Sequence, residues 1–194
     1  MRILYYSILA LALAGCGLFE TRSPEEPESG GENMPPATSP ALLADNFTRS
    51  FNRKSLEDYM NCIADSGFTF QPAADAAARY PALFNDWNAS DERRYLLSFF
   101  AQAPNTELGY LTLSKVSYEA QTPDSAIYAA NYDISFEASA SAVRKSYSGS
   151  LRLIMKPAST GLWTIWKWQD FSRKADSTNA APESWSALKA AFHN

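Results

Sequence analysis

Apolar residues recur at helical spacing at the start of the folded segment. Leu43, Phe47 and Phe51 lie four residues apart, which places them on one face of a helix. Ser39 and Pro40 stand directly before this stripe; Ser is a preferred helix cap and Pro is favoured in the first turn. The pattern therefore predicts a helix that begins here and buries an aromatic face.

A second helix is predicted shortly afterwards. Ser55 and Asp58 have the spacing of a capping box, with Asp where Glu is usual. Residues 65–67, Asp-Ser-Gly, end this helix, and residues 68–70 indicate a short strand. Residues 72–90 mix Ala-rich helical potential with a proline break, so their structure stays open.

Strands dominate the second half of the chain. Ser90 is the predicted cap of a third helix, which runs from Asp91 to about Gln102. Four long strands are predicted at about 108–119, 125–138, 144–156 and 161–171. The last helix, over about 183–192, carries Trp185, Leu188, Ala191 and Phe192 at three- and four-residue spacing. Helices followed by a run of antiparallel strands predict an α+β domain with helices on one face of a curved sheet.

The last strand has large apolar groups at both parities. The two sets are Trp163 and Ile165 on one side, and Trp166, Trp168 and Asp170 on the other. Either the strand is covered on both faces, or a bulge near Lys167 changes the parity. With a bulge, Trp168 and Asp170 would join the first set and face inward.

The chain starts with a short apolar run. Residues 3–14 follow a basic Arg2, but a membrane-spanning helix needs about 20 apolar residues. A charged start, a short apolar run and small residues at its end describe a secretory signal peptide. Leu13-Ala14-Gly15-Cys16 resembles the bacterial lipobox, in which an aliphatic and two small residues precede an invariant Cys. The resemblance implies that residues 1–15 are removed and that Cys16 is lipidated; the alternative is an ordinary signal peptide.

Lipidation of Cys16 would decide where the protein is located. Two or three acyl chains, such as palmitate, bury enough CH₂ groups, at about 0.8 kcal/mol each, to anchor a protein stably in a lipid bilayer. The resemblance therefore implies a lipid-anchored protein of the cell envelope. Gly17 stands where Asp would favour inner-membrane retention, which indicates the outer membrane, facing the periplasm or the cell surface.

Composition separates a linker from a folded domain. Residues 17–40 contain five Pro, and five Glu against one Arg, which predicts a disordered acidic linker. The expected organisation is a signal peptide over 1–15, lipidated Cys16 with its linker over 16–40, and a domain over 41–194. The whole chain is 46% hydrophobic, enough for a packed core. The domain holds 15 Lys or Arg against 16 Asp or Glu, so it lacks the basic excess expected of a nucleic-acid-binding protein.

Two stretches resemble the nuclear-transport-factor-2-like superfamily, also called SnoaL-like or ketosteroid-isomerase-like. They are "LLADNFTRSFNRKSLEDYMNCIADSGFTF" and "GLWTIWKWQDF", and the resemblance spans roughly residues 40–171. It implies a cone-shaped fold in which N-terminal helices pack on the concave face of a curved antiparallel sheet, with a pocket between them. It also implies frequent dimerisation through the sheet. Functions in the superfamily range from isomerases and dehydratases to partner-binding modules, so the fold cannot decide among them.

Catalytic members of the superfamily use a carboxylate or His in the cone, with a Tyr or acidic donor opposite. The candidate carboxylates are Asp75, Asp133 and Asp170, and the candidate donors are Tyr110, Tyr128 and Tyr132. Strand alternation places Asp133 on the face opposite the apolar residues, so it is expected to face solvent. Asp75 and Asp170 remain as catalytic candidates. The single His, His193, is penultimate and expected to be frayed.

An aromatic-lined pocket is one interpretation of the inward residues. Tyr132, Trp163, Trp168 and Asp170 would then bind a ligand, with the carboxylate at the pocket floor or rim. The alternative is core packing, with Asp170 bonded to a backbone group or a Trp N–H. Cys62 has no disulfide partner once Cys16 is lipidated, and it is expected to be a buried apolar residue rather than a nucleophile.

No sequence motif for a metal, nucleotide or catalytic triad occurs, so neither a cofactor nor a metal is expected. The sequence favours a non-enzymatic, membrane-tethered binding or scaffold module with an apolar cone interior. Its partners would be the bilayer through Cys16, a protein or a second copy through the sheet, or an apolar small ligand, but not nucleic acid. The alternative is a small-molecule isomerase, dehydratase or hydrolase that uses a pocket Asp.

Overall fold

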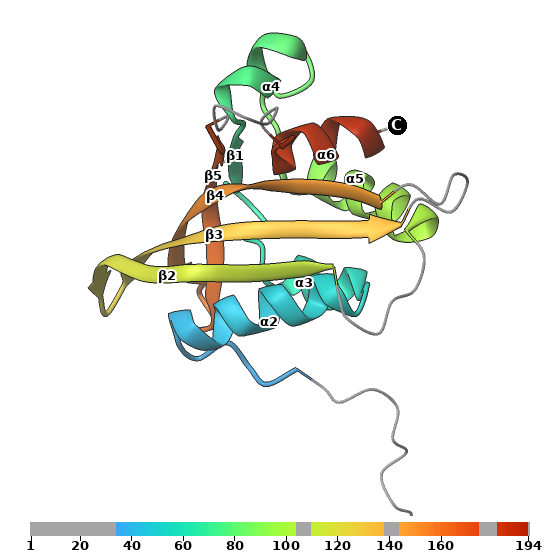
Figure 1. Cartoon of the computed structure of the whole chain (residues 1–194). Helices are drawn as coiled ribbons and strands as arrows, with labels where there is room; N and C mark the ends of the chain where they lie inside the picture. The colour runs from blue at the N-terminus through green and yellow to red at the C-terminus, as the bar shows by residue number, and fades with distance from the viewer. Residues whose placement is uncertain (1–33, 104–109, 138–143, 175–181, 194) are drawn as a thin grey trace, which may run out of the picture. The chain divides into compact units, whose positions relative to one another are not determined.

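The structure is a computed structural model, and it describes residues 34–103, 110–137, 144–174 and 182–193 (Figure 1). The predicted signal peptide, the lipid site Cys16 and most of the predicted linker lie outside the described residues. In the part of the chain that the structure describes, no helix is both long and apolar enough to cross a membrane.

Among the described residues, four helices and one short strand precede the long strands. They are α2 (Pro40–Asn52), α3 (Leu56–Asn61), β1 (Thr69–Gln71), α4 (Ala74–Arg79) and α5 (Ala89–Gln102). The two predicted N-terminal helices, the short strand and the third helix are confirmed to within a few residues. The open segment 72–90 contains α4.

The cap of α2 follows the sequence prediction. The Ser39 side chain accepts the backbone N–H of Leu42 at 3.2 Å, and Pro40 occupies the first turn. The stripe of Leu43, Phe47 and Phe51 is completely buried. This helix is therefore held by an N-terminal cap and by one aromatic face, as its spacing indicated.

Two other caps differ from the prediction. The cap of α5 is Asn88 rather than Ser90: its side chain accepts the Ser90 N–H at 2.8 Å, and Asp91 accepts the Asn88 N–H at 3.1 Å. Ser55 does not cap α3 through its side chain, because its hydroxyl donates to Asp58 Oδ2 at 2.6 Å instead. Helix α5 therefore begins two residues earlier than predicted, and Ser55 is the N-cap residue of α3 without a side-chain bond to the helix backbone.

The five strands form one sheet in the order β1-β5-β4-β3-β2. The long strands are β2 (Leu111–Thr122), β3 (Ser125–Glu137), β4 (Arg144–Pro157) and β5 (Trp163–Ser172), and neighbouring long strands are antiparallel. β1 pairs with β5 in parallel, with Phe70 opposite Trp168, so the sheet is not wholly antiparallel as expected. Helices α2, α3 and α5 lie on one side of the curved sheet (Figure 1). The expected α+β fold class is confirmed.

A bulge in β5 decides between the two interpretations of the last strand. Ile154 pairs with Lys167 and the next residue, Met155, pairs with Ile165, so Trp166 is the extra residue. The residues brought to the buried side are Trp163, Ile165, Trp168 and Asp170. The bulge interpretation is confirmed, and it is the bulge that turns Asp170 inward.

The C-terminal helix α6 (Trp185–Phe192) is inserted against the sheet on the same side as α5 (Figure 1). Its first residues, Trp185 and Ser186, are completely buried, and so is Leu188. His193 was expected to be frayed, but its ring packs on Trp87 at a centroid distance of 4.9 Å. We call the space between the concave face of the sheet and helices α2, α3 and α5 the cone; α6 occupies part of it.

Candidate functional site

Tyr132 and Asp170 meet inside the cone. Tyr132 lies on β3 and Asp170 on β5, with β4 between them. The Tyr132 hydroxyl donates to Asp170 Oδ1 at 2.7 Å, and both side chains are buried. The Tyr132 ring reaches across β4 over Gly149, where a β-carbon would lie 2.5 Å from the Tyr132 hydroxyl oxygen. Two candidates that the sequence singled out therefore form a direct pair.

The first turn of α6 closes over this pair. Asp170 Oδ2 accepts the Ser186 backbone N–H at 2.7 Å and the Ser186 hydroxyl at 2.5 Å. The Trp185 backbone N–H donates to the Tyr132 hydroxyl oxygen at 2.7 Å. The first N–H groups of any helix have no acceptor within that helix. In α6 the N–H groups of Trp185 and Ser186 find their acceptors in the Tyr132–Asp170 pair. Both carboxylate oxygens of Asp170 are engaged.

Burial controls the protonation of this pair. Loss of solvent raises the pKa of Asp170 above its usual range, although the bonds from Ser186 and Tyr132 oppose the shift. Burial also raises the pKa of Tyr132, and the neighbouring Asp170 adds to that shift. The arrangement resembles a base facing a hydroxyl donor, which is the chemistry that proton abstraction requires.

Trp185 fills the space beside the pair. Its ring lies edge-on to Trp168 at 4.6 Å, to Phe51 at 5.1 Å and to Tyr132 at 5.2 Å between centroids. Its indole N–H donates to the Tyr95 hydroxyl oxygen at 3.0 Å. Trp185 is completely buried, so a helix of the chain itself occupies the place where the family resemblance implied a pocket.

A buried ion pair lies deeper on α6. Lys189 Nζ contacts the Glu92 carboxylate, and neither side chain is exposed. Glu92 also accepts the Tyr59 hydroxyl at 2.9 Å and the Trp87 indole N–H at 2.9 Å. Burial lowers the pKa of Lys189, while the charge of Glu92 opposes that shift. Helix α6 therefore makes polar contacts at two places in the cone, at the Tyr132–Asp170 pair and at Glu92.

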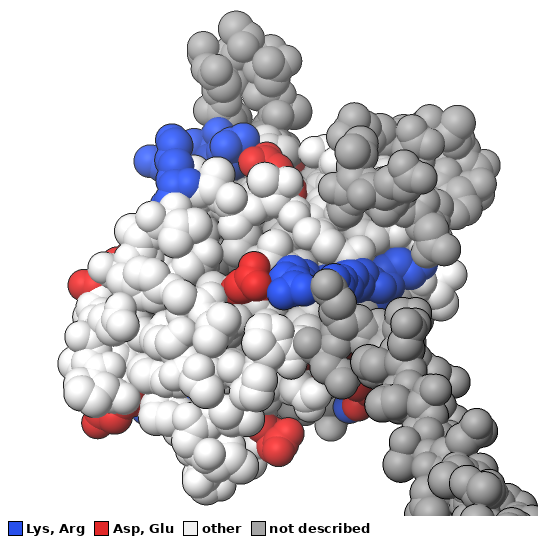
Figure 2. All heavy atoms as spheres, turned by 90° about the horizontal axis from the view of Figure 1, so that it is seen from below, with Lys and Arg blue, Asp and Glu red and all other residues white. Residues whose placement is uncertain are grey.

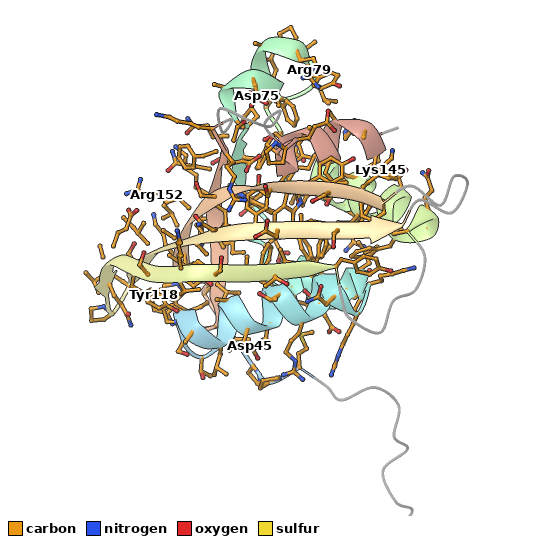
Figure 3. The ribbon with its side chains drawn as sticks, viewed as in Figure 1. Asp45, Asp75, Arg79, Tyr118, Lys145 and Arg152 are labelled. Carbon is orange, nitrogen blue, oxygen red and sulfur yellow. The ribbon has the colours of Figure 1, made fainter. Side chains whose placement is uncertain are left out.

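The other candidate residues lie outside this constellation. Asp75 is exposed on α4, where the Ser172 hydroxyl donates to it (Figure 3). Asp133 is exposed on β3, and its carboxylate lies 3.9 Å from Arg173, so its predicted solvent-facing orientation is confirmed. Trp168 lines the cone behind Trp185. The sequence left both Asp75 and Asp170 as catalytic candidates. In the structure Asp170 is buried beside Tyr132, whereas Asp75 is exposed.

The two remaining donor candidates, Tyr110 just before β2 and Tyr128 on β3, lie away from this pair. The Tyr128 ring is packed edge-on against Tyr118 at 5.4 Å near the β2–β3 turn, and burial raises its pKa to about 12. Tyr110 packs against Phe99 at 6.0 Å. Tyr132 is the candidate donor that the structure places at Asp170.

A surface groove lies outside the cone. Its volume is about 710 Å³, and it lies where the chain enters the domain, between the segment at Pro35 and the β4–β5 turn. Trp163, Cys62 and Trp166 contribute to its walls. Trp163, a candidate ligand-binding residue, therefore lines this groove. Neither Tyr132 nor Asp170 lines it. Cys62 is buried and its pKa is raised to about 12, in keeping with the expected apolar role.

Sequence reasoning missed Glu92 and Lys189. Each lies on the apolar stripe of its helix: Glu92 precedes Tyr95 and Leu96 by three and four residues, and Lys189 follows Trp185 by four. The sequence did contain a signal for this pair: Glu92 is an acidic residue on one apolar helix face, and Lys189 is a basic residue on another. Two such buried charges of opposite sign need each other as partners. Among the described residues, no group of three or more His, Cys, Asp or Glu side chains could hold a metal ion.

No family model matches the chain, and no curated protein matches it. Solved structures do match. A proposed scytalone dehydratase from Novosphingobium aromaticivorans has a TM-score of 0.56 at 8% identity, over 74% of this chain and 89% of that one. A conserved protein from Planctomyces limnophilus has a TM-score of 0.53 at 8% identity, over 68% and 91%.

A third match is a proposed aromatic ring hydroxylase from the same Novosphingobium species, with a TM-score of 0.51 at 10% identity, over 66% and 81%. The domain has the nuclear-transport-factor-2-like fold. The expected fold is thereby confirmed. At these identities the likeness concerns the fold alone, and the function has to be argued from the site.

Proposed function

We propose that this chain is a non-enzymatic binding or scaffold module of the cell envelope, tethered to the membrane through Cys16. One observation supports it above others: α6 occupies part of the cone and its Ser186 bonds to Asp170 Oδ2, while Tyr132 of β3 bonds to Oδ1, so both carboxylate oxygens are engaged within the chain. A general base needs a substrate atom within about 3 Å. Here that position is taken by the backbone and side chain of Ser186.

The tether follows from the sequence. Residues 34–40 of the predicted linker are bonded to the domain, since Asn46 donates to the Pro35 carbonyl oxygen and Ser39 caps α2. Lipidation at Cys16 and the acidic segment 17–33 would hold the domain near the membrane and leave it free to reorient. As a flexible chain of 17 residues, this segment would have an r.m.s. span of roughly 20–25 Å. Such a chain suits a module that presents a surface to partners in the envelope.

The outer face of the sheet is the surface we assign to a protein partner or to a second copy of the chain. Asn131, Ser150 and Phe171 pair across three strands on this face, and Phe171 is 45% exposed. Close by, Arg152 forms an ion pair with Glu119 at 2.6 Å and donates to the Gln169 side chain at 3.2 Å (Figure 3). An apolar group among neutral and paired polar groups is compatible with a transient interface.

The face below α2 is a poorer candidate for a binding surface. Figure 2 shows that most of it is uncharged, with basic side chains in a central row beside an acidic group and in a second cluster at the upper left, and with further acidic groups near the edges. On α2, Arg49 lies 3.5 Å from Asp45, so part of this charge is compensated within the helix. A broad basic surface of the kind that binds nucleic acid is not seen in this view.

A small-molecule isomerase, dehydratase or hydrolase is the second candidate. The specific observation in its favour is the buried pair of Tyr132 and Asp170, with the pKa of Asp170 raised. This function would require α6 to leave the cone, because Trp185 and Ser186 cover the pair.

A site-specific photocrosslinking experiment tests the proposed interaction surface. A photoreactive phenylalanine analogue would replace Phe171 on the outer face, or Tyr80, which is 36% exposed beside α4, as the control. In intact cells we expect a discrete covalent product from position 171 and none from position 80. Equal products from both positions, or none from either, would count against a partner surface on the sheet.

An activity test separates the two candidate functions. Wild-type protein and an Asp170→Asn variant would be incubated with carbonyl and hydroxy-aromatic compounds and followed by product analysis. The proposed function predicts no turnover by either protein. Turnover that disappears in Asp170→Asn, while the variant keeps its folded spectrum, would instead establish the enzyme.

A further inference from the structure

The ammonium group of Lys189 lies in a box of aromatic rings. The distances from Nζ to the ring centroids are 4.1 Å for Trp168, 4.3 Å for Phe70, 5.1 Å for Tyr95 and 5.4 Å for Trp87. All four are within the range of a cation–π interaction, and the Glu92 carboxylate supplies a full counter-charge. We call these four rings and Glu92 the ammonium box.

Every wall of the ammonium box comes from elements other than α6. Phe70 is on β1, Trp87 precedes α5, Glu92 and Tyr95 are on α5, and Trp168 is on β5. Helix α6 contributes the cation and none of the walls. The ammonium box thus corresponds to a binding site, and the Lys189 ammonium group corresponds to its ligand, although both belong to one chain.

The carboxylate is fixed in advance of the cation. Tyr59 donates to Glu92 Oε1 and Trp87 donates to Glu92 Oε2, each at 2.9 Å, so the acceptor is oriented by groups that do not belong to α6. Without Lys189, Glu92 would be a completely buried and uncompensated charge. A box of this kind selects a cation over a neutral group of the same shape.

Fold stability alone does not account for the box. Replacement of a buried ion pair by packed apolar residues is often neutral or stabilising, so such a pair is weak evidence for a stabilising role. Four aromatic rings converging on one ammonium group are instead the arrangement that recognises organic cations. The direct contact of Nζ with Glu92 favours a primary ammonium, because a quaternary one has no N–H to donate.

We infer that the cone contains a binding site for a primary alkylammonium group, and that Lys189 of α6 occupies this site as an internal ligand. The site concerns the interior of the cone, so it goes beyond the proposed function and does not depend on a partner at the outer face. An external primary amine, or a lysine side chain of another protein, can enter only where Lys189 has been removed or withdrawn.

Chemical rescue tests the site. Lys189→Ala removes three carbons and the ammonium nitrogen, which together correspond to n-propylammonium. We expect this variant to lose on the order of 10 °C in melting temperature, because Glu92 is left unpaired. Added n-propylammonium should then raise the melting temperature in a saturable way, by about 4 °C at ten times its dissociation constant.

The controls separate binding from solvent effects. 1-Propanol at the same concentration, with sodium chloride to match ionic strength, should not restore the variant. The double variant Lys189→Ala/Glu92→Gln should not respond to n-propylammonium. Lys167→Ala, a half-buried lysine on β5 outside the box, should not respond either.

If Lys189→Ala does not fold in buffer, the fraction that refolds is measured as n-propylammonium is added, using tryptophan emission. Recovery with n-propylammonium and not with 1-propanol supports the site. Equal recovery with 1-propanol, recovery that persists in the Glu92→Gln background, or no recovery at any concentration would overturn it.

Discussion

Gly149 on β4 is paired directly with Tyr132 on β3, and the missing side chain is what lets the Tyr132 ring cross β4 to Asp170. A β-carbon at position 149 would lie 2.5 Å from the Tyr132 hydroxyl oxygen and 2.8 Å from Cζ of the same ring. It would also collide with the Phe171 backbone carbonyl oxygen. The buried Tyr132–Asp170 pair is therefore conditional on one glycine.

Gly149→Ala should displace the Tyr132 ring and break its bond to Asp170. We expect a loss of about 1–3 kcal/mol in the free energy of unfolding from overpacking, and more if Asp170 is left without this donor. Urea unfolding followed by tryptophan emission measures the loss. Gly161→Ala is a control for space, since nothing lies within 4 Å of a β-carbon there, although its φ of +79° adds strain of its own. Equal losses that both remain below 1 kcal/mol would show that the close approach is unimportant.

Asp170→Asn should change how stability depends on pH. Burial raises the folded-state pKa of Asp170 above its unfolded value of about 3.9, so its stabilising contribution is present below that value. The contribution is lost as the pH rises through the raised folded-state pKa. The stability of the wild type relative to Asp170→Asn should therefore fall as the pH rises from the unfolded-state pKa through the raised folded-state pKa.

The measurement is a set of urea unfolding curves for both proteins at several pH values. The difference between the two proteins removes contributions from other titrating groups, provided that they are unchanged. A difference that is constant with pH, or that increases with it, would contradict the raised pKa of Asp170.

The elements that could be predicted from the sequence are those whose pattern is local. The stripe of Leu43, Phe47 and Phe51 predicted α2, and the parity conflict in the last strand left two alternatives, of which the bulge near Lys167 is the correct one, with Trp166 as the extra residue. The cap at Ser90 was misassigned, because Asn88 caps α5. Ser55 is the N-cap residue of α3 as predicted, but its hydroxyl donates to the Asp58 side chain and makes no bond to the helix backbone. Local spacing shows which bonds a residue can make, but not which of them it makes.

The candidate site could be predicted only in part. Tyr132 and Asp170 were both candidates, yet their meeting depends on the long-range register of β3, β4 and β5. The insertion of α6 was not foreseen, because an amphipathic helix at the end of a chain can pack on many apolar surfaces. Glu92 and Lys189 lie 97 residues apart, and no local pattern joins them.

Trp185→Ala should open the cone. Trp185 is completely buried among aromatic rings, so the substitution removes a large volume that its neighbours cannot refill. We expect the free energy of unfolding to fall by about 3–5 kcal/mol. Leu97→Ala on α5 is the surface control, since Leu97 is 54% exposed and should change stability by no more than about 0.5 kcal/mol. A similar loss for both variants would show that α6 is not a packed part of the core.

Cys62 should be an unreactive thiol in the folded protein. It is buried, and loss of solvent raises its pKa to about 12, so the reactive thiolate is scarce at neutral pH. In a Cys16→Ser background, where Cys62 is the remaining thiol, labelling by a maleimide should be about a thousandfold slower than for an exposed Cys. Urea should restore rapid labelling. Fast labelling without denaturant would mean that the groove beside Cys62 opens readily.

Cys16→Ser should release the protein from the membrane. Without the thiol no acyl chain can be attached, so the proposed lipid anchor is lost. Fractionation of cells should then move the protein from the membrane pellet to the soluble fraction, and incorporation of labelled palmitate should disappear. Cys62→Ser is the matched control, because it removes the other cysteine and should leave both membrane association and palmitate incorporation unchanged. Identical fractionation of the two variants would show that the lipobox resemblance does not describe how this chain is anchored.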